Sequence, residues 1–287
     1  MPNNLKLISH ETIDHFINIY LGLGILFQHC EPKKEINEAP LLPPESSLVA
    51  DFSAFAKVPN QKSLLDTVSY MNYKAAYLNV AFWQIVITIN LGVPVLAFRE
   101  AFNHKAQYVD NLKLWEWQYS VKTTEYILAK QKVDTVIYTA KLQGKIISDS
   151  IDWKMYLTKT NGNNTFSNFL WYYGMTAISN KGGWWIMNEN PFQVQKFLFI
   201  NWSRQNDSIG MIKYTNIRPN SSGGYLEYGT QLPDENNMNA YYNIMDTANN
   251  KTVEIRVNLQ THAGRIKKIN ETKWSCWDSQ LRDVNCE

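Results

Sequence analysis

The chain has 287 residues, a formal net charge of +2, 19% charged residues and 13% aromatic residues. Length alone allows one large domain or two small ones, and it suffices to bury a sizeable core. The nearly balanced charge, with no dense run of lysine or arginine, argues against a nucleic-acid-binding surface, so no nucleic-acid partner is predicted. The abundance of aromatic residues favours strands.

Residues 1–29 are interpreted as a signal-like leader. The stretch from Phe16 to Phe27 is apolar, has the length of a signal-peptide core and is too short to span a bilayer. Lys6 is the only basic side chain before it, and two acidic residues intervene, which departs from the usual basic start. A wrongly assigned start codon is one explanation for that departure.

Three cysteines are present. Cys30 follows the apolar run, whereas Cys276 and Cys286 lie close together near the C-terminus. An odd cysteine in an exported protein needs an explanation, and one lipidated cysteine plus one small-loop disulfide, Cys276–Cys286, supplies it. Three unrelated thiols in a cytosolic protein are the alternative.

Residues 30–46 hold many charges and four prolines, three of them at positions 40, 43 and 44, a composition typical of an extended tether. Cys30-Glu-Pro, the run Ala39-Pro40-Leu-Leu-Pro43-Pro44-Glu-Ser46-Ser47, and Asp51-Phe52-Ser53-Ala-Phe55 together resemble the start of uncharacterised envelope lipoproteins of Bacteroidota type. The run Trp274-Ser-Cys276-Trp277-Asp278 is similar to the end of the same proteins.

The resemblance implies that Cys30 carries lipid in the mature protein. It therefore implies a membrane partner and a location in the cell envelope, at the outer membrane or the periplasmic face, but no reaction. His29 departs from the small residues that usually precede a lipidated cysteine.

The predicted helical part covers residues 60–110. Asn60-Gln61-Lys62-Ser63 offers caps, and the run from Tyr73 to Phe98 is almost wholly apolar. A helix that is apolar on all sides is normally buried, so we expect core helices. Pro94 should end or kink the first helix, with a second near Val95–Lys105, giving a hydrophobic helical hairpin. A membrane-spanning helix is the rival interpretation, against which the polar residues inside the run argue.

From residue 112 to 287 the hydrophobic pattern has a period of two, as in the run Trp115–Val121. Regular short runs of this kind, separated by turn residues, predict an antiparallel meander of about ten strands. Trp184 and Trp185 must point to opposite faces, so both faces of the sheet carry aromatic residues.

We therefore expect one globular domain over residues 47–287 with an α+β fold. Its mostly antiparallel sheet forms a curved meander or incomplete barrel packed around the helical hairpin. A two-layer sandwich is the alternative.

Motifs for catalysis are scarce. Only His104 and His262 lie in the body of the chain, and neither a phosphate-binding glycine loop nor a nucleophile elbow is present. The sequence therefore predicts no catalytic residue, no metal site and no cofactor. Two of the scattered carboxylates could still pair for glycoside hydrolysis, which leaves a carboxylate-based glycan hydrolase as one alternative.

Four tryptophans are the candidates for ligand binding: Trp153, Trp171, Trp184 and Trp185. Flat aromatic rings stack on sugars and line apolar pockets, although packing in the core explains any single one of them as well. The function predicted is a lipid-anchored envelope lipoprotein that binds a lipid, a glycan or another apolar ligand through an aromatic sheet face. A structural or accessory subunit that docks a partner protein is the other alternative.

Overall fold

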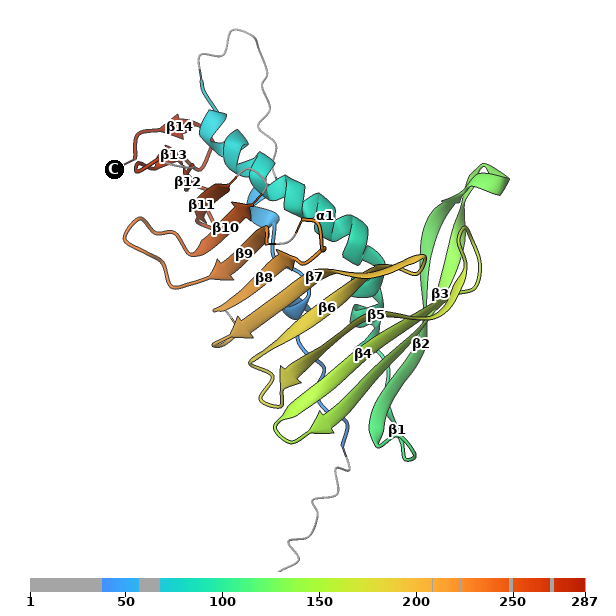
Figure 1. The fold of residues 1–287 in the computed structure, drawn as a ribbon. Coiled ribbons are helices and arrows are strands. Elements are labelled where there is room, and N and C mark those ends of the chain that lie inside the picture. Colours follow the sequence, from blue (N-terminus) through green and yellow to red (C-terminus); the bar gives the residue numbers. More distant parts are fainter. Residues whose placement is uncertain are drawn as a thin grey trace, which may run out of the picture. The chain divides into compact units, whose positions relative to one another are not determined.

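The structure, a computed structural model, describes residues 38–56 and 68–287 apart from positions 208, 222, 248, 249, 269, 270 and 287. In this part the chain forms one antiparallel sheet of 14 strands, with one α-helix, α1 (Met71–Ala101), laid across it (Figure 1). The mostly antiparallel α+β class is thus confirmed. The predicted leader 1–29, the anchor Cys30 and the caps at residues 60–63 lie outside the described residues.

The strands follow one another in chain order, and the sheet is not closed because β1 and β14 are its two edges. Four short strands, β1 and β12 to β14, were not predicted, because two to four residues are too few to show an alternation. The strands are β1 (Gln107–Val109), β2 (Leu114–Ile127), β3 (Lys132–Ile147), β4 (Ser150–Lys159), β5 (Phe166–Ala177), β6 (Gly182–Asn190), β7 (Gln193–Arg204), β8 (Gly210–Asn216), β9 (Tyr225–Thr230), β10 (Ala240–Asp246), β11 (Lys251–Val257), β12 (Gly264–Lys267), β13 (Ser275–Trp277) and β14 (Asp283–Val284).

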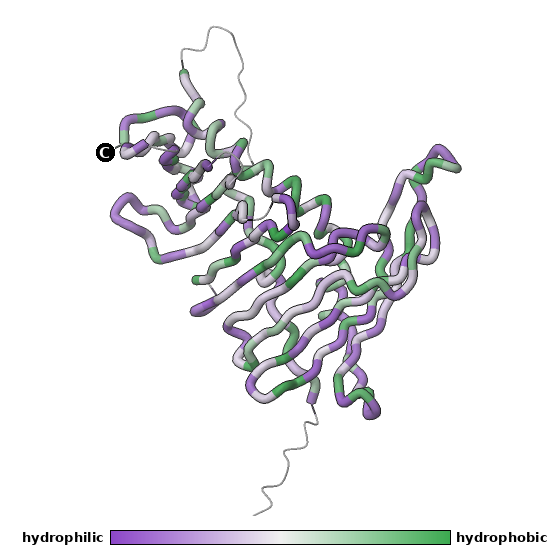
Figure 2. The backbone as a smooth tube through the Cα atoms, in the orientation of Figure 1, coloured by the Kyte–Doolittle hydropathy of each residue, from purple (hydrophilic) through white to green (hydrophobic). Residues whose placement is uncertain are grey.

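One face of the sheet is the core face. In β4 every second residue is buried, including Trp153 and Leu157, while the residues between them are half-exposed. The same alternation of hydrophobic and hydrophilic residues continues along the strands (Figure 2). Successive side chains of a strand point to opposite faces of the sheet, so alternating hydrophobic residues all lie on one face. Together they form a continuous apolar surface on which α1 can pack.

The predicted helical hairpin is replaced by one continuous helix. Pro94 lies inside α1, which runs on to Ala101. Proline in a helix interior costs about 3 kcal/mol through its missing hydrogen bond and its ring clash. Residues on both sides of it, including Leu91 and Phe98, are buried against the sheet. Packing of that extra length of helix offsets the cost, so the helix does not turn back at Pro94.

The described N-terminal residues, 38–56, lie on the core face together with α1. The buried hydroxyl of Tyr214 donates to the carbonyl of Leu48 at 3.0 Å and accepts from the amide of Ala50 at 2.7 Å. The Tyr242 hydroxyl donates to the carbonyl of Asp51 at 2.6 Å. Desolvation in this site raises the pKa of Tyr214. Hydroxyls from two strands thus hold a segment that has no strand partner of its own.

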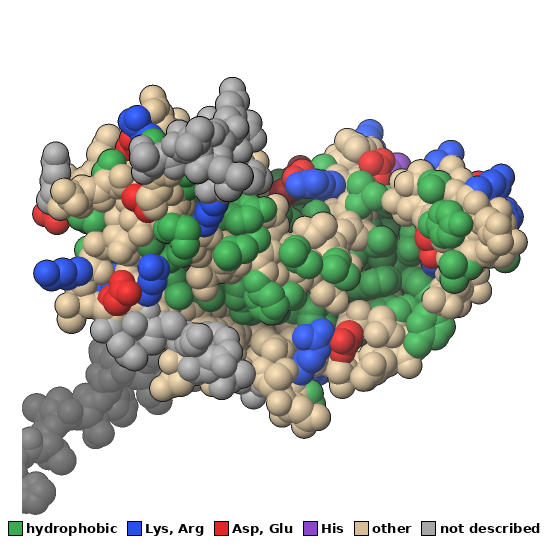
Figure 3. All heavy atoms as spheres, turned by 90° about the horizontal axis from the view of Figure 1, so that it is seen from above, with side chains coloured by type: hydrophobic (Ala, Val, Ile, Leu, Met, Phe, Trp, Pro, Cys, Tyr) green, Lys and Arg blue, Asp and Glu red, His purple; other side chains and the backbone are tan. Residues whose placement is uncertain are grey.

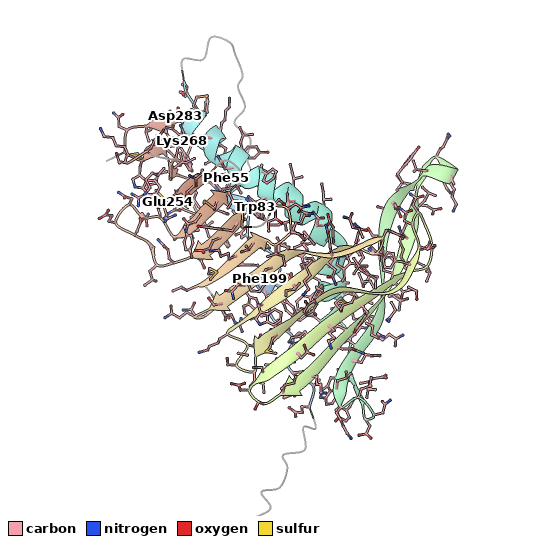
Figure 4. All side chains as sticks on the ribbon, viewed as in Figure 1. Phe55, Trp83, Phe199, Glu254, Lys268 and Asp283 are labelled. Atoms are coloured by element: carbon pink, nitrogen blue, oxygen red, sulfur yellow. A yellow bond between two sulfur atoms is a disulfide. The ribbon has the colours of Figure 1, made fainter. Side chains whose placement is uncertain are left out.

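The C-terminal loop is closed by the predicted disulfide between Cys276 and Cys286, whose Cα atoms lie 5.3 Å apart. The loop carries Asp283, which lies beside the first turn of α1 (Figure 4). The Asp283 carboxylate accepts hydrogen bonds from the amides of Met71 at 3.1 Å and Asn72 at 2.9 Å. A side chain more than 200 residues away in sequence therefore caps the helix N-terminus.

Candidate ligand-binding groove

A groove of about 800 Å³ lies between the N-terminal half of α1 and the ends of three interior strands of the sheet. One wall consists of α1 side chains, among them Leu78, Phe82 and Val86. The opposite wall is formed by the ends of β7, β8 and β10 and by the turn between β8 and β9. This volume lies in the range of small-molecule sites, which are mostly apolar and carry a few polar groups.

The inner part of the groove is apolar. Trp83 of α1 and Leu198 of β7 are both buried at its base, next to Phe197 and Ile244. Figure 4 shows Trp83 at the middle of α1, on the side of the sheet. The base carries no charged side chain among the described lining residues. A ligand lying there would exchange water for hydrocarbon contacts.

The rim of the groove is polar, and Arg218 is its one charged residue among those described. Its Nη2 donates to Glu189 Oε1 at 2.9 Å, and its guanidinium lies 5.1 Å from the centre of the Phe197 ring. The hydrogen bond from Arg218 holds the pKa of Glu189 below its ordinary value. With its side chain 32% exposed, Arg218 is fixed in place yet still presents a cation to solvent.

Two further hollows are less suited to an apolar ligand. One of about 420 Å³ lies at the β1 edge and is lined mainly by polar side chains such as Lys105, Gln107 and Glu116. The other, of about 620 Å³, lies between surface loops that include Asn206 and Gln231. Neither has a buried apolar base comparable to that of the groove.

The four tryptophans predicted to bind ligand do not meet at one place. Trp153 and Trp185 are fully buried on the core face, and the Trp153 indole donates to Thr176 Oγ1 at 2.8 Å. Trp184 lies half-buried on the opposite face, where its ring is 6.3 Å from that of Phe199.

Trp171 belongs to a separate aromatic cluster in the N-terminal half of β5. A bulge there leaves it without a cross-strand partner in β4, and its ring lies 5.3 Å from that of Phe169 and 5.7 Å from that of Phe166. None of the four tryptophans lines the groove described above.

Several carboxylates on the sheet are paired with cations. Glu227 lies 3.3 Å from Lys213, and Glu254 lies 2.6 Å from Lys267. Glu125 lies 2.7 Å from the buried Lys159. Within the described ranges no group of three or more His, Cys, Asp or Glu side chains is placed to hold a metal ion.

The groove residues on α1 were missed because the sequence was interpreted as a helix apolar on all sides. The structure buries one face only, at positions such as Tyr73, Val80 and Ile87, and leaves Leu78 and Phe82 exposed on the other. Two apolar stripes at helical spacing, half a turn apart, were the signal that could have identified them.

No protein-family model matches the chain, and neither a curated protein nor a solved structure shows significant similarity to it. Function is therefore argued from the groove and the residues around it.

Proposed function

We propose that the protein is an envelope lipoprotein, anchored through a lipid on Cys30, whose folded part binds an acyl chain in the groove beside α1. The carrying observation is the groove itself, an apolar cleft of about 800 Å³ with a fixed arginine at its rim. An apolar base takes up hydrocarbon, and the guanidinium of Arg218 suits a carboxylate or phosphate head group. The ligand class is thus a single-chain or double-chain lipid with an anionic head.

The test is a titration of the full-length chain with a fluorescent fatty acid. Binding should be saturable, and Val86→Trp should weaken it by about tenfold or more, because the larger ring fills the groove. Val133→Trp is the matched control, since Val133 is 62% exposed at the start of β3 and does not line the groove. Equal binding by both variants would refute the groove as the site.

The head-group assignment has its own test. Arg218→Met keeps an unbranched side chain of similar length but removes the charge. It should weaken binding of a fatty acid and leave binding of the corresponding fatty alcohol unchanged, because only the acid carries a charge for Arg218 to meet. Equal losses for both ligands would show that Arg218 acts through packing alone.

The anchor is tested separately by the intact mass of the protein taken from its native membrane fraction. A chain that begins at Cys30 and carries acyl groups, with both features lost in Cys30→Ala, supports the proposal. An unmodified chain that still carries residues 1–29 contradicts it and leaves the groove proposal standing.

A further inference from the structure

The sheet has one long stretch of edge that no described strand covers. β1 pairs with β2 only at residues 114–116, beside the lower part of β2 in Figure 1, and β14, at the other edge of the sheet, has two residues. Residues 117–124 of β2, here called the free edge, have β3 on one side and no described strand on the other. At the rise of an extended strand the free edge is about 27 Å long.

The bonds on β3 identify the backbone groups of β2 that face outward. On the β4 side of β3, the Ile137 carbonyl accepts from the Thr160 amide at 3.4 Å, and the Ile137 amide donates to Asn161 Oδ1 at 2.7 Å. In an antiparallel sheet the N–H and C=O of one residue point to the same side, and the side alternates from residue to residue. Tyr138 therefore bonds to Val121, which lies opposite it in β2, and the residues next to Val121 turn their N–H and C=O outward. The outward residues of the free edge are Gln118, Ser120, Lys122 and Thr124.

The backbone groups of these four outward residues have no hydrogen-bond partner within the described ranges. Beyond them the Tyr126 carbonyl accepts from the side chain of Asn163 at 2.9 Å, which ends the free edge on that side. A hollow of about 420 Å³ adjoins Gln118 and Ser120 where β1 stops, and Lys105 lines its other side. The space beside the edge is therefore open to another strand.

The free edge lacks the features that normally prevent strand pairing, which are very short strands, prolines, bulges and several charges. The register between β2 and β3 runs without a bulge from Trp115 to Ile127. The free edge contains no proline, and Lys122 is its one charged residue. On the core face the Tyr119 hydroxyl donates to the Ala97 carbonyl of α1 at 2.6 Å. The strand is thus extended and held in place before any partner binds.

A second copy of the chain fits this edge poorly. Two β2 strands that keep their core faces on one side would pair antiparallel about a two-fold axis. β1 blocks the edge at residues 114–116, so the hairpin of the other copy must end before that point. Every register that clears β1 brings Tyr126, whose carbonyl is already bound, into the ladder, and the longest one sets Lys122 opposite its own copy. A short separate strand meets neither obstacle.

Positive charge exceeds negative charge along the free edge. Lys105 and Lys122 form no ion pair with a described residue. Glu116, which lines the same hollow, accepts a hydrogen bond from Gln143 at 2.8 Å. Several Lys and Arg side chains lie at the end of the molecule that β2 and β3 form (Figure 3). An acidic partner therefore suits this edge better than a basic one.

We propose that the free edge binds an extended acidic segment of a partner protein, which joins the sheet as a further strand beside β2. Main-chain hydrogen bonds to the four outward residues hold such a strand, and a carboxylate opposite Lys122 favours acidic sequences. The free edge shares no residue with the groove beside α1, so this binding is independent of the proposed function.

The probe is a labelled octapeptide in which valine alternates with threonine and glutamate, titrated with the full-length protein and followed by fluorescence anisotropy. Residues opposite one another in an antiparallel pair share a face, so the polar residues of the peptide lie opposite the outward residues of β2 and bond to them. N-methylation of the amides of these polar residues should abolish binding. N-methylation of the valine amides is the matched control, because these amides point away from β2, and it should leave binding unchanged.

Amide hydrogen exchange and two variants locate the contact. In the free protein the outward amides of Gln118 and Ser120 should exchange fast, and the peptide should slow them. Ser120→Pro removes an outward amide and leaves the ladder to β3 intact, so it should lose most of the binding. Lys122→Glu should weaken binding of the acidic peptide roughly fivefold at low salt, and replacing the glutamates of the peptide by lysines should restore it.

Three results would overturn the proposal. A peptide that does not bind the folded protein would refute the free edge as a binding site. Binding that survives methylation of the polar residues would show that strand pairing does not carry it, and this arm needs no variant, so it decides the question even if Ser120→Pro fails to fold. Slow exchange of Gln118 and Ser120 in the free protein would show that another part of the chain or a second copy covers the edge, and slowing that grows with protein concentration would identify the copy.

Discussion

The cap that Asp283 places on α1 should depend on the disulfide that closes its loop. The carboxylate accepts hydrogen bonds from the amides of Met71 and Asn72 and from the hydroxyl of Ser69. Replacing a capping carboxylate by alanine costs about 1 kcal/mol, and removing its charge from the positive end of a helix adds up to about 1 kcal/mol. Asp283→Ala should therefore lower the free energy of unfolding by about 2 kcal/mol.

The disulfide contributes through the unfolded chain. It joins residues ten apart, which by loop entropy stabilises the fold by about 2.5 kcal/mol. Without it the loop is free to leave α1, so part of the cap is already lost. In a Cys276→Ser, Cys286→Ser background, Asp283→Ala should cost less than in the disulfide-bonded protein, and the difference should be about 1 kcal/mol.

Urea unfolding of the four proteins in this double-mutant cycle measures the coupling. Asp207→Ala is the control, because its side chain is 96% exposed beside Arg204 and its loss should change little in either background. Equal costs of Asp283→Ala with and without the disulfide would show that the loop stays docked on its own. No cost in the disulfide-bonded protein would refute the cap.

Three further predictions concern buried tyrosines and two glycines. Tyr214→Phe should lower the free energy of unfolding in urea by about 2 kcal/mol, because it leaves a buried carbonyl and a buried amide without a hydrogen-bond partner. Tyr172→Phe should be nearly neutral, because the Tyr172 hydroxyl has no hydrogen-bond partner among the described residues. Equal losses for the two variants would contradict this account. Gly92→Ala should raise the melting temperature, because alanine favours the helix by about 1 kcal/mol over glycine. Gly174→Ala should lower the melting temperature, because its Cβ would lie 2.0 Å from a backbone oxygen. A lower melting temperature for Gly92→Ala together with a higher one for Gly174→Ala would refute this packing. Burial raises the pKa of Tyr73 to about 12, so the folded state keeps a proton that the unfolded chain releases above pH 10. The free energy of unfolding should therefore fall as the pH rises past 10. A free energy of unfolding that does not change with pH in this range would refute the prediction.

Local patterns in the sequence were sufficient to predict most of the sheet. The alternation in runs such as Trp115–Val121 and the turn residues between runs correspond to strands that are long enough to repeat. The end of the helix could not be predicted in this way, because Pro94 is locally unfavourable and only the sheet beneath Leu91 and Phe98 makes the longer helix stable. Strands of two or three residues likewise form only because a neighbouring strand pairs with them, and their own sequence shows no alternating pattern.

The candidate site was less accessible to sequence reasoning. Tryptophans were singled out for their chemistry, and Trp153 and Trp185 proved to be fully buried in the core. The groove depends instead on ordinary residues such as Val86 and Phe197, which come together from α1 and β7. Their residue types are common in any core, so only their placement distinguishes them.

The sequence by itself predicted the mostly antiparallel class of the fold, because the period-two pattern repeats along the chain. It offered the pairing of Cys276 with Cys286 as one of two interpretations, and the structure shows that bond. The tertiary structure alone decided which side of α1 stays exposed. Tyr73, Val80 and Ile87 on one stripe are no more hydrophobic than Leu78, Phe82 and Ile89 on the other, and a single sheet can cover only one of them. Because the sheet covers one side of α1 only, Leu78 and Phe82 stay exposed on the other side and form part of the groove wall.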